Sequence, residues 1–269
     1  MTAPLFSIAI LVLNQMDMTR QCIQTIRAHS SQHVPILIID NGSDPAYQEE
    51  LRGLGDYYLR NETNIGVIPA MNQAWQLLDT PYIMYLHNDL FILEPHFDAK
   101  INRILAAIPY VGVAGFGGGH SVDCRGARTS FTSNMINAEL YGTRMQQEFV
   151  PSVVLDGMCL IVRKELILEI GGIALQYPVH HYYDLDICLE SIYRGYKIIT
   201  INIAINHVGS QTSSQADYTL WLAQYGHTEH TLHGHNQQIF YQKWGHKQSV
   251  IVDSYFNYFD VNGQIPMKV

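Results

Sequence analysis

Short apolar segments alternate with amphipathic stretches through the first half of the chain. The apolar segments are rich in β-branched and aromatic residues, which predicts buried strands. Between them, apolar residues recur every three or four positions, which indicates helices packed on a sheet. The expected strands cover residues 6–13, 34–40, 57–60, 82–87, 111–115 and 197–205. Such alternation is typical of an α/β fold with a mostly parallel, Rossmann-like sheet flanked by helices.

The limits of the expected helices follow from proline, glycine and capping residues. The first helix is capped by Asp17, and two more open at Pro69 and Pro95. Later helices are expected over 164–170 and 184–194, each followed by glycine.

The remainder of the chain is less regular. Residues 116–150 are rich in Gly, Ser, Thr and Asn, which predicts loops and short strands beside a ligand. From about Ser214 the pattern is helical and aromatic, and the last stretch, 246–269, has no clear period. We therefore expect a principal domain over 1–213 and a helical, aromatic C-terminal extension over 214–269.

Composition narrows the possible functions. The 269 residues are 47% hydrophobic and 15% charged, which is ordinary for a globular protein. A net charge of -8 argues against nucleic-acid binding, which needs a basic surface, but leaves room for an anionic small ligand. The four cysteines form no C-x-x-C pair, which indicates reduced, buried thiols. The apolar segment 5–13 is too short to cross a membrane, so we expect a cytoplasmic protein without a transmembrane segment.

Polar side chains follow three of the expected strands. Asn14 follows the first, Asp40 ends the second, and His87-Asn88-Asp89 follows the strand 82–87. Each alone is compatible with an ordinary turn. Because parallel strands end along one edge of a sheet, the three together predict a nucleotide site there.

The usual phosphate-binding loops are absent from the chain. After the first strand, residues 14–17 contain no glycine, and no G-x-x-x-x-G-K-[ST] segment occurs. The glycine-rich segment 115–119 is followed by His120 where a spaced glycine would be needed. A bound diphosphate would therefore need another source of positive charge, and a divalent metal on Asp89 would supply it.

In their order and spacing, these features resemble family 2 glycosyltransferases of the GT-A fold, the inverting type that uses nucleotide-diphospho-sugars, with rhamnosyltransferase-like members among them. The resemblance covers residues 6 to about 245, and His87-Asn88-Asp89 occupies the family's metal-binding D-x-D position. The other matching segments are 7–14, 38–44, 61–66, 70–74, 156–164, 183–187 and 207–209. Each segment alone is a weak signal.

The resemblance implies a role for each matching residue. Asp184 would be the general base that takes a proton from the acceptor. Asp89 would bind a divalent metal, Mn²⁺ or Mg²⁺, with His207 and His87 as further ligands. The nucleotide-sugar donor would be bound by Leu13, Asn14, Asp40, Asn64, Asn72 and Asn88, with Asp40 at the base.

The same resemblance divides the principal domain into a nucleotide-sugar-binding half, 1–100, and an acceptor-side half, 101–213. It implies transfer of a hexosyl or rhamnosyl group from a UDP- or dTDP-sugar to a hydroxyl of a glycan or lipid-linked acceptor. Family members of this type often take part in polysaccharide biosynthesis. A position peripheral to the membrane and a homodimer are both compatible with it.

Several departures from the family pattern keep alternatives open. His87 stands where the family usually has Asp or Asn, and Tyr183 stands where it usually has Glu. Both departures leave open the alternative that the chain is a catalytically idle nucleotide-sugar or glycan-binding module with the same fold. The alternative to a general base at Asp184 is a residue that only caps the helix. Asp186 is expected to cap the helix or to orient a neighbour. A nucleotidyltransferase would need a Gly- and Arg/Lys-rich loop at 14–17.

Histidines are dense near the C-terminal end. With Glu229 as their only nearby carboxylate, a solvated helix face is the favoured interpretation of this group rather than a metal site. The group comprises His227, His230, His233 and His235. His180 and His181, just before Asp184, either contact the acceptor or are merely exposed.

Overall fold

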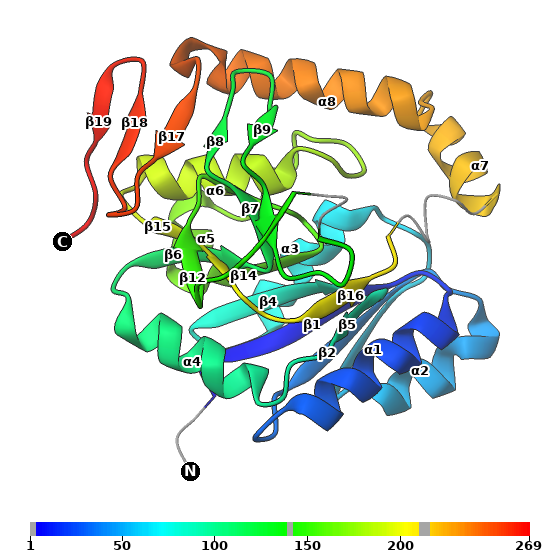
Figure 1. The fold of residues 1–269 in the computed structure, drawn as a ribbon. Helices are drawn as coiled ribbons and strands as arrows, with labels where there is room; N and C mark the ends of the chain where they lie inside the picture. Colours follow the sequence, from blue (N-terminus) through cyan, green and yellow to red (C-terminus); the bar gives the residue numbers. More distant parts are fainter. Residues whose placement is uncertain (1–3, 139–141, 210–215) are drawn as a thin grey trace.

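An eight-stranded sheet forms the centre of the computed structural model, which describes residues 4–138, 142–209 and 216–269 (Figure 1). Four of its seven strand pairs are parallel, which confirms the expected mostly parallel sheet. In spatial order the strands are β12 (Phe149–Pro151), β15 (Lys197–Ile201), β6 (Val111–Gly115), β14 (Cys159–Arg163), β4 (Tyr82–His87), β1 (Phe6–Val12), β2 (Ile36–Asn41) and β3 (Tyr57–Asn61).

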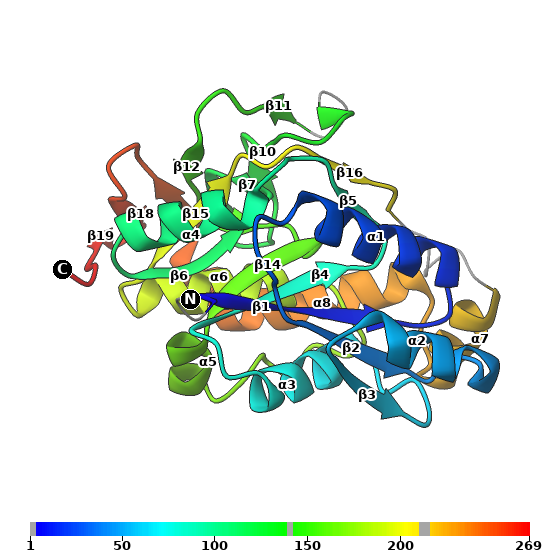
Figure 2. The same cartoon turned by 90° about the horizontal axis from the view of Figure 1, so that it is seen from below.

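Helices cover both faces of this sheet (Figure 2). Side chains of β1 alternate between the faces, as the period of a strand requires. Ile8 and Ile10 enter one core layer, and Ala9 enters the other. The first layer contains α1 (Met16–His29), α2 (Gln48–Leu54) and α4 (Phe97–Ala107); the second contains α3 (Val67–Leu77), α5 (Lys164–Ile170) and α6 (Tyr183–Tyr193).

Some helix starts differ from the expectation. Asp17 is not the cap of α1, because Gln15 holds the N-cap position in a left-handed conformation and Asp17 lies in the first turn, paired with Arg20 at 2.5 Å. Pro69 lies inside the first turn of α3, because Gly66, with φ of 90°, already turns the chain into the helix. These shifts of one or two residues leave the order of elements unchanged.

Three small sheets flank the central one. The expected strand 197–205 is split, since the chain leaves β15 at Ile201 and then pairs with a different strand. One small sheet joins β16 (Ile205–His207) to β5 (Leu90–Ile92). Another joins β11 (Thr143–Arg144), β10 (Thr132–Ser133), β7 (Gly117–Gly119) and β13 (Val154–Leu155). The segment 116–150 thus holds short strands, as expected.

The C-terminal tail also forms strands, which its irregular pattern did not predict. Its strands β17 (Val250–Val252), β18 (Tyr258–Asp260) and β19 (Gly263–Ile265) extend the hairpin of β8 (Ser121–Val122) and β9 (Arg128–Thr129). Tyr258 is fully buried, and its hydroxyl accepts from the Ile198 amide at 2.8 Å and donates to the Ser152 carbonyl at 3.1 Å. The tail therefore packs on the chain's own domain.

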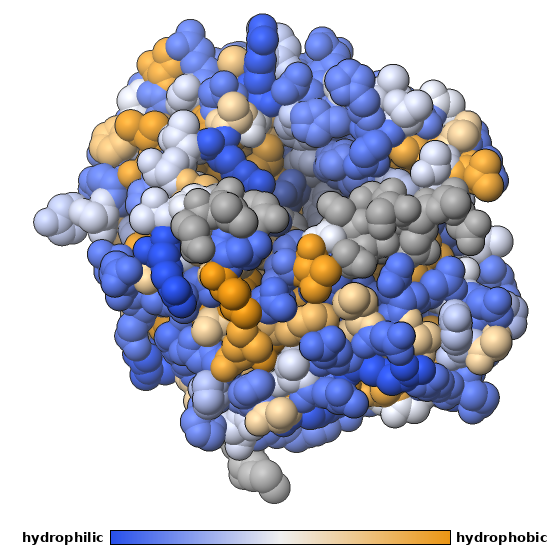
Figure 3. All heavy atoms as spheres, turned by 45° about the vertical axis from the view of Figure 1, so that its right-hand side comes forward, coloured by the Kyte–Doolittle hydropathy of each residue, from blue (hydrophilic) through white to orange (hydrophobic). Residues whose placement is uncertain are grey.

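Two helices, α7 (Ala216–Gln224) and α8 (Glu229–Trp244), form the helical part of the expected extension and lie above the sheet in Figure 1. Short 3₁₀ turns occur at Pro45–Tyr47 and Gly245–Lys247. None of the helices within the described residues is long and apolar enough to cross a membrane. On the face drawn in Figure 3, hydrophilic side chains predominate and hydrophobic ones form small groups, as expected when apolar side chains fill the two core layers.

Asp186 fastens α8 to the domain. Its carboxylate is buried and accepts from the Tyr177 hydroxyl at 2.9 Å, the Trp244 indole at 2.8 Å and the Lys243 ammonium at 3.0 Å. The side chain thus orients neighbours rather than capping its own helix. Burial raises the pKa of Asp186, and Lys243 opposes that rise.

We expect Asp186→Ala to lower the free energy of unfolding by about 3 kcal/mol, because the Trp244 indole and the Tyr177 hydroxyl lose their buried acceptor. Lys243 loses one of its two carboxylate partners and keeps Glu190 at 2.5 Å. Urea denaturation would measure the change. Asp79→Ala is the matched control, since that fully exposed carboxylate pairs with Lys164 at 3.0 Å, and exposed ion pairs contribute little to stability. Equal losses in the two variants would contradict the anchoring role.

Candidate functional site

A cavity of about 730 Å³ opens beside the carboxyl ends of β1 and β4. Its size suits a small-molecule ligand. Its wall also includes residues of the β8–β9 hairpin, the start of α6, and both helices of the extension. Six of the predicted site residues line it: Leu13, Asn64, His87, Asn88, Asp89 and Asp184.

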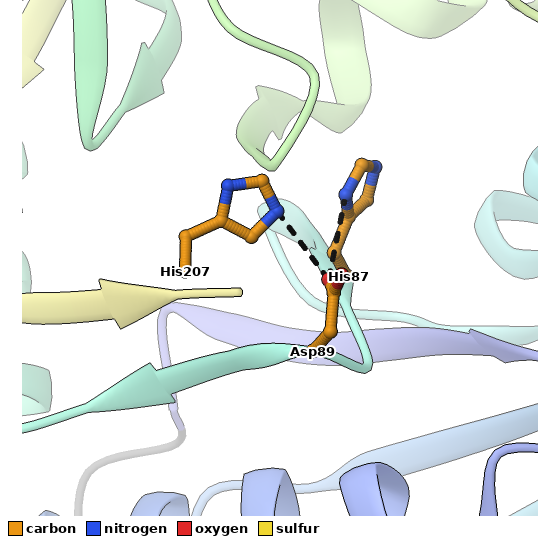
Figure 4. A group of neighbouring side chains, drawn as sticks. All are labelled: His87, Asp89 and His207. Atoms are coloured by element: carbon orange, nitrogen blue, oxygen red, sulfur yellow. Dashed lines mark ion pairs between the residues drawn. The ribbon is translucent and has the colours of Figure 1, made fainter. Parts of the chain in front are cut away.

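His87, Asp89 and His207 form a cluster at one side of the cavity (Figure 4). Asp89 Oδ1 lies 3.3 Å from His207 Nε2 and 3.9 Å from His87 Nδ1. The sheet creates this arrangement, because β16 pairs with β5 and places His207 opposite Leu90, next to Asp89. Residues far apart in the sequence thereby meet at one point.

The cluster fits a divalent metal ion. His207 Nε2 is buried and makes no hydrogen bond, although it lies within ion-pair distance of Asp89. A buried nitrogen without a partner is costly, and a metal ion would satisfy it. Partial desolvation in the cavity and the neighbouring His207 lower the pKa of His87, although 46% of its side chain is exposed. The lower pKa favours the neutral ring, which is the form that can ligate a metal. Burial opposes the charge on Asp89, but His207 and His87 hold the pKa of that carboxyl below its usual value.

Asp184 stands at the start of α6, where the chain enters the helix through Tyr182 in a left-handed conformation. The Gly157 amide donates to Asp184 Oδ2 at 3.2 Å. This approach needs glycine, because a Cβ at position 157 would lie 2.7 Å from the Tyr183 hydroxyl oxygen. The Leu185 amide donates to Asp184 Oδ1 at 3.0 Å, so both oxygens of the carboxylate are held by backbone amides while the side chain lines the cavity.

Two carboxylates near the cavity have opposite environments. Burial, followed by the charge of Asp156, raises the pKa of Asp184 to about 6. Asp156 pairs with Arg128 at 2.9 Å. Although burial opposes its charge, this guanidinium holds the pKa of Asp156 below its ordinary value. Separated pKa values assign different roles to paired acids, so Asp184 is the better proton acceptor and Asp156 stays ionised.

Asp40 does not line the cavity. Its carboxylate is fully buried and accepts from Arg60, from the Tyr58 hydroxyl at 2.8 Å and from the Ser43 amide at 2.9 Å. In this structure it holds Arg60 and the turn after β2. A role in binding a base stays a prediction for this residue.

Asn14 and Asn72 also lie outside the cavity lining. Asn14 Oδ1 accepts from the Asp44 amide at 2.9 Å, which joins the turns after β1 and β2. The Asn72 side chain accepts from the Ile173 amide at 2.8 Å and donates to its carbonyl at 2.9 Å. Both hold loops beside the site, and their contact with a donor stays a prediction.

Comparison with known proteins gives the family. The model of glycosyl transferase family 2 matches residues 7–171, more than half of the chain. The chain belongs to glycosyl transferase family 2. A search of curated proteins found no match for it.

Solved glycosyltransferase structures share the fold of this family 2 chain. The mannosyltransferase PcManGT from Pyrobaculum calidifontis, in complex with GDP-Man and Mn²⁺, gives a TM-score of 0.56 at 12% identity over 83% of this chain and 61% of its own. GalNAc-T7 with UDP, GalNAc and Mn²⁺ gives 0.60 at 13% identity over 75% and 43%. S. aureus TarS 1-349 gives 0.53 at 13% over 76% and 60%. The chain therefore spans about half of these structures, and the likeness establishes the GT-A fold.

Four other residues that line the cavity of the family 2 chain were not singled out as site residues in the sequence: Arg128, Tyr218, Trp221 and Glu229. The Trp221 indole donates to the Asn64 carbonyl at 3.2 Å, which holds α7 beside the part of the cavity that contains Asn64. Of these residues, only Glu229 had a signal, as the one carboxylate among the C-terminal histidines. The four C-terminal histidines are His227, His230, His233 and His235. Within the described parts of the chain, they do not form a group with metal-binding spacing.

Proposed function

We propose that this protein transfers a sugar, with inversion, from a UDP- or dTDP-linked donor to a hydroxyl of a glycan or related acceptor. One observation carries the proposal: Asp89 and His87, two residues of the Asp89 cluster, line the same cavity as Asp184. The cluster fits the diphosphate end of a donor, and Asp184 fits an incoming hydroxyl. The alternative, an idle binding module, would leave the raised pKa of Asp184 without a use.

Asp89, His207 and His87 would hold Mn²⁺ or Mg²⁺, since the Asp89 carboxylate suits either ion and three protein ligands leave positions for phosphate oxygens. When bound, this metal would stabilise the negative charge of the leaving diphosphate as a Lewis acid. Two structures of similar fold contain Mn²⁺ together with GDP-Man or UDP, which supports this part of the proposal.

Asp184 would act as the general base. It would accept the proton of the acceptor hydroxyl while that oxygen attacks the anomeric carbon from the side opposite the diphosphate. The Gly157 amide fixes the carboxylate at 3.2 Å, and Asp156 keeps its charge beside it. Leu13, Asn64 and Asn88 would contact the nucleotide part of the donor, because they line the cavity near Asp89.

The family resemblance favours a hexosyl or rhamnosyl group and an acceptor that belongs to a growing polysaccharide. A cytoplasmic enzyme that works at the membrane surface on a lipid-linked glycan is consistent with that choice.

A panel of sugar nucleotides tests the proposal. The protein would be incubated with UDP- and dTDP-linked hexoses and dTDP-rhamnose, with and without Mn²⁺, and release of nucleoside diphosphate would be followed. Metal-dependent release from one donor is expected, and an added acceptor should increase it. Nucleotide binding without release from any donor would favour the idle module instead.

The pH dependence gives a separate prediction. Because Asp184 must be deprotonated to act as a base, kcat/KM should rise with pH through about 6 and then level off. Asp156→Asn should shift this limb to lower pH, since it removes the negative charge that helps to raise the pKa of Asp184. If the pH at which kcat/KM rises is the same in Asp156→Asn as in the unaltered protein, the group that titrates is not Asp184.

A further inference from the structure

We propose that His180, His181 and Glu229 form a second site for a divalent metal ion such as zinc, made of residues other than those of the Asp89 cluster. All three residues line the cavity, and their ligand atoms lie within 4.8 Å of one another. This inference does not depend on the proposed transfer reaction.

The distances suit a tetrahedral metal. His181 Nε2 lies 2.7 Å from Glu229 Oε1, and His180 Nε2 lies 3.4 Å from Glu229 Oε2. Ligands about 2.1 Å from a tetrahedral zinc ion lie roughly 3.4 Å apart, so small movements would accommodate the ion. Two histidines and one carboxylate are also the ligand set of several zinc sites that keep one position open.

The histidine-bearing loop is shaped to bring its two rings together. Side chains of consecutive residues usually diverge, but here the two ring centroids are 3.9 Å apart. Val179, His181 and Tyr182 all have positive φ, between 65° and 69°. Non-glycine residues adopt this conformation at a cost, and such residues cluster at functional sites. The strain therefore points to a function for the convergence of His180 and His181.

Neighbouring elements hold this loop in place. Asn236 of α8 is fully buried and donates to the carbonyls of Pro178, at 3.1 Å, and His180. On the other side, the Val67 amide donates to the Val179 carbonyl at 3.2 Å. Support of this kind positions metal ligands before the ion arrives.

The two clusters are held by different elements of the fold. The Asp89 cluster lies at a strand end where the donor diphosphate is proposed, whereas Glu229 is the first residue of α8 and ties the extension to the loop before Asp184. Tyr218 contacts the same group, since its hydroxyl donates to Glu229 Oε2 at 3.1 Å. A metal here would fix α7 and α8 over the cavity and leave its open position to water or to an oxygen of a bound molecule.

Cobalt binding tests the site without reference to activity. Metal-free Asp89→Ala protein, in which the first cluster lacks its carboxylate, would be titrated with Co²⁺ and followed by visible absorption. We expect tight binding with the intense bands of tetrahedral cobalt. Adding Glu229→Gln, which keeps the size of the side chain, should weaken that binding by at least about 100-fold, more than the loss of an outer partner.

His230→Ala in the same background is the matched control, because His230 is an exposed histidine on the same helix, and it should leave the titration unchanged. His181→Gln offers a second ligand variant on a different element. Equal cobalt affinity with and without Glu229→Gln, or the absence of tetrahedral bands, would overturn the proposal and leave the three residues as a hydrogen-bonded contact between the loop and α8.

Discussion

Asp89→Ala is expected to reduce kcat/KM for metal-dependent transfer or donor hydrolysis by about 1,000-fold. Asp89 is the only carboxylate in its cluster and is 5% exposed. One charge pair about 4 Å apart is worth roughly 4 kcal/mol at an effective dielectric near 20, and this energy corresponds to about 1,000-fold in rate. The loss should appear mainly as weaker metal-dependent donor binding, measured by varying the donor and Mn²⁺ concentrations.

Asp79→Ala serves as the control for this prediction too, because its exposed carboxylate lies outside the cavity lining. It should keep full activity. The kcat/KM of His207→Ala should fall between those of the two variants, since the substitution removes an imidazole ligand and keeps the Asp89 carboxylate. An Asp89→Ala protein that folds and retains most of its activity would contradict the assigned metal site.

Asp184→Asn is expected to lower kcat by about 100- to 10,000-fold, the usual contribution of a general base, while donor binding stays close to that of the unaltered protein. The asparagine has the size of the aspartate, and its oxygen can still accept from one of the two backbone amides, of Gly157 and Leu185, that donate to the carboxylate. Steady-state kinetics measures the first effect, and thermal stabilisation by the nucleotide measures the second. A variant that turns over normally would assign the base to another residue.

Stability gives this variant an independent readout. The pKa of Asp184 is about 6 in the folded state, above the ordinary value of an aspartate, which the unfolded chain has. Ionisation of Asp184 therefore favours the unfolded state, and the contribution of this group to folding stability falls as pH rises from about 4 through 6. Asp184→Asn removes this cost, so above pH 6 the variant should unfold at an equal or higher temperature than the unaltered protein.

Most strands of the central sheet and two residues of the Asp89 cluster, His87 and Asp89, were predictable from the sequence, because both depend on local patterns. Apolar segments predicted β1 and β4, and the polar residues that follow these strands predicted a site that includes Asp89. His207 came only from the family resemblance, since nothing local shows that β16 pairs with β5.

Other parts of the site depend on long-range contacts that a local pattern does not contain. The sequence shows that a carboxylate follows a strand, but it does not show whether that carboxylate faces a cavity or a neighbouring guanidinium. Asp40 is an example, because it pairs with Arg60. Glu229 appeared solvated among histidines of its own helix, yet it contacts the loop before α6. The C-terminal strands formed because β8 offered an edge for β17 to pair with, which the irregular aromatic pattern of the tail did not reveal.

The most direct test of the account is thermal unfolding of the unaltered protein and Asp89→Ala with UDP, dTDP and GDP, each with and without Mn²⁺. A nucleotide present at about 100 times its dissociation constant should add roughly 2.7 kcal/mol to the stability. We expect UDP or dTDP to stabilise the unaltered protein only with Mn²⁺, and Asp89→Ala to lose the effect. Stabilisation by none of the three, with or without metal, would contradict the assignment of the cavity as a nucleotide-sugar site.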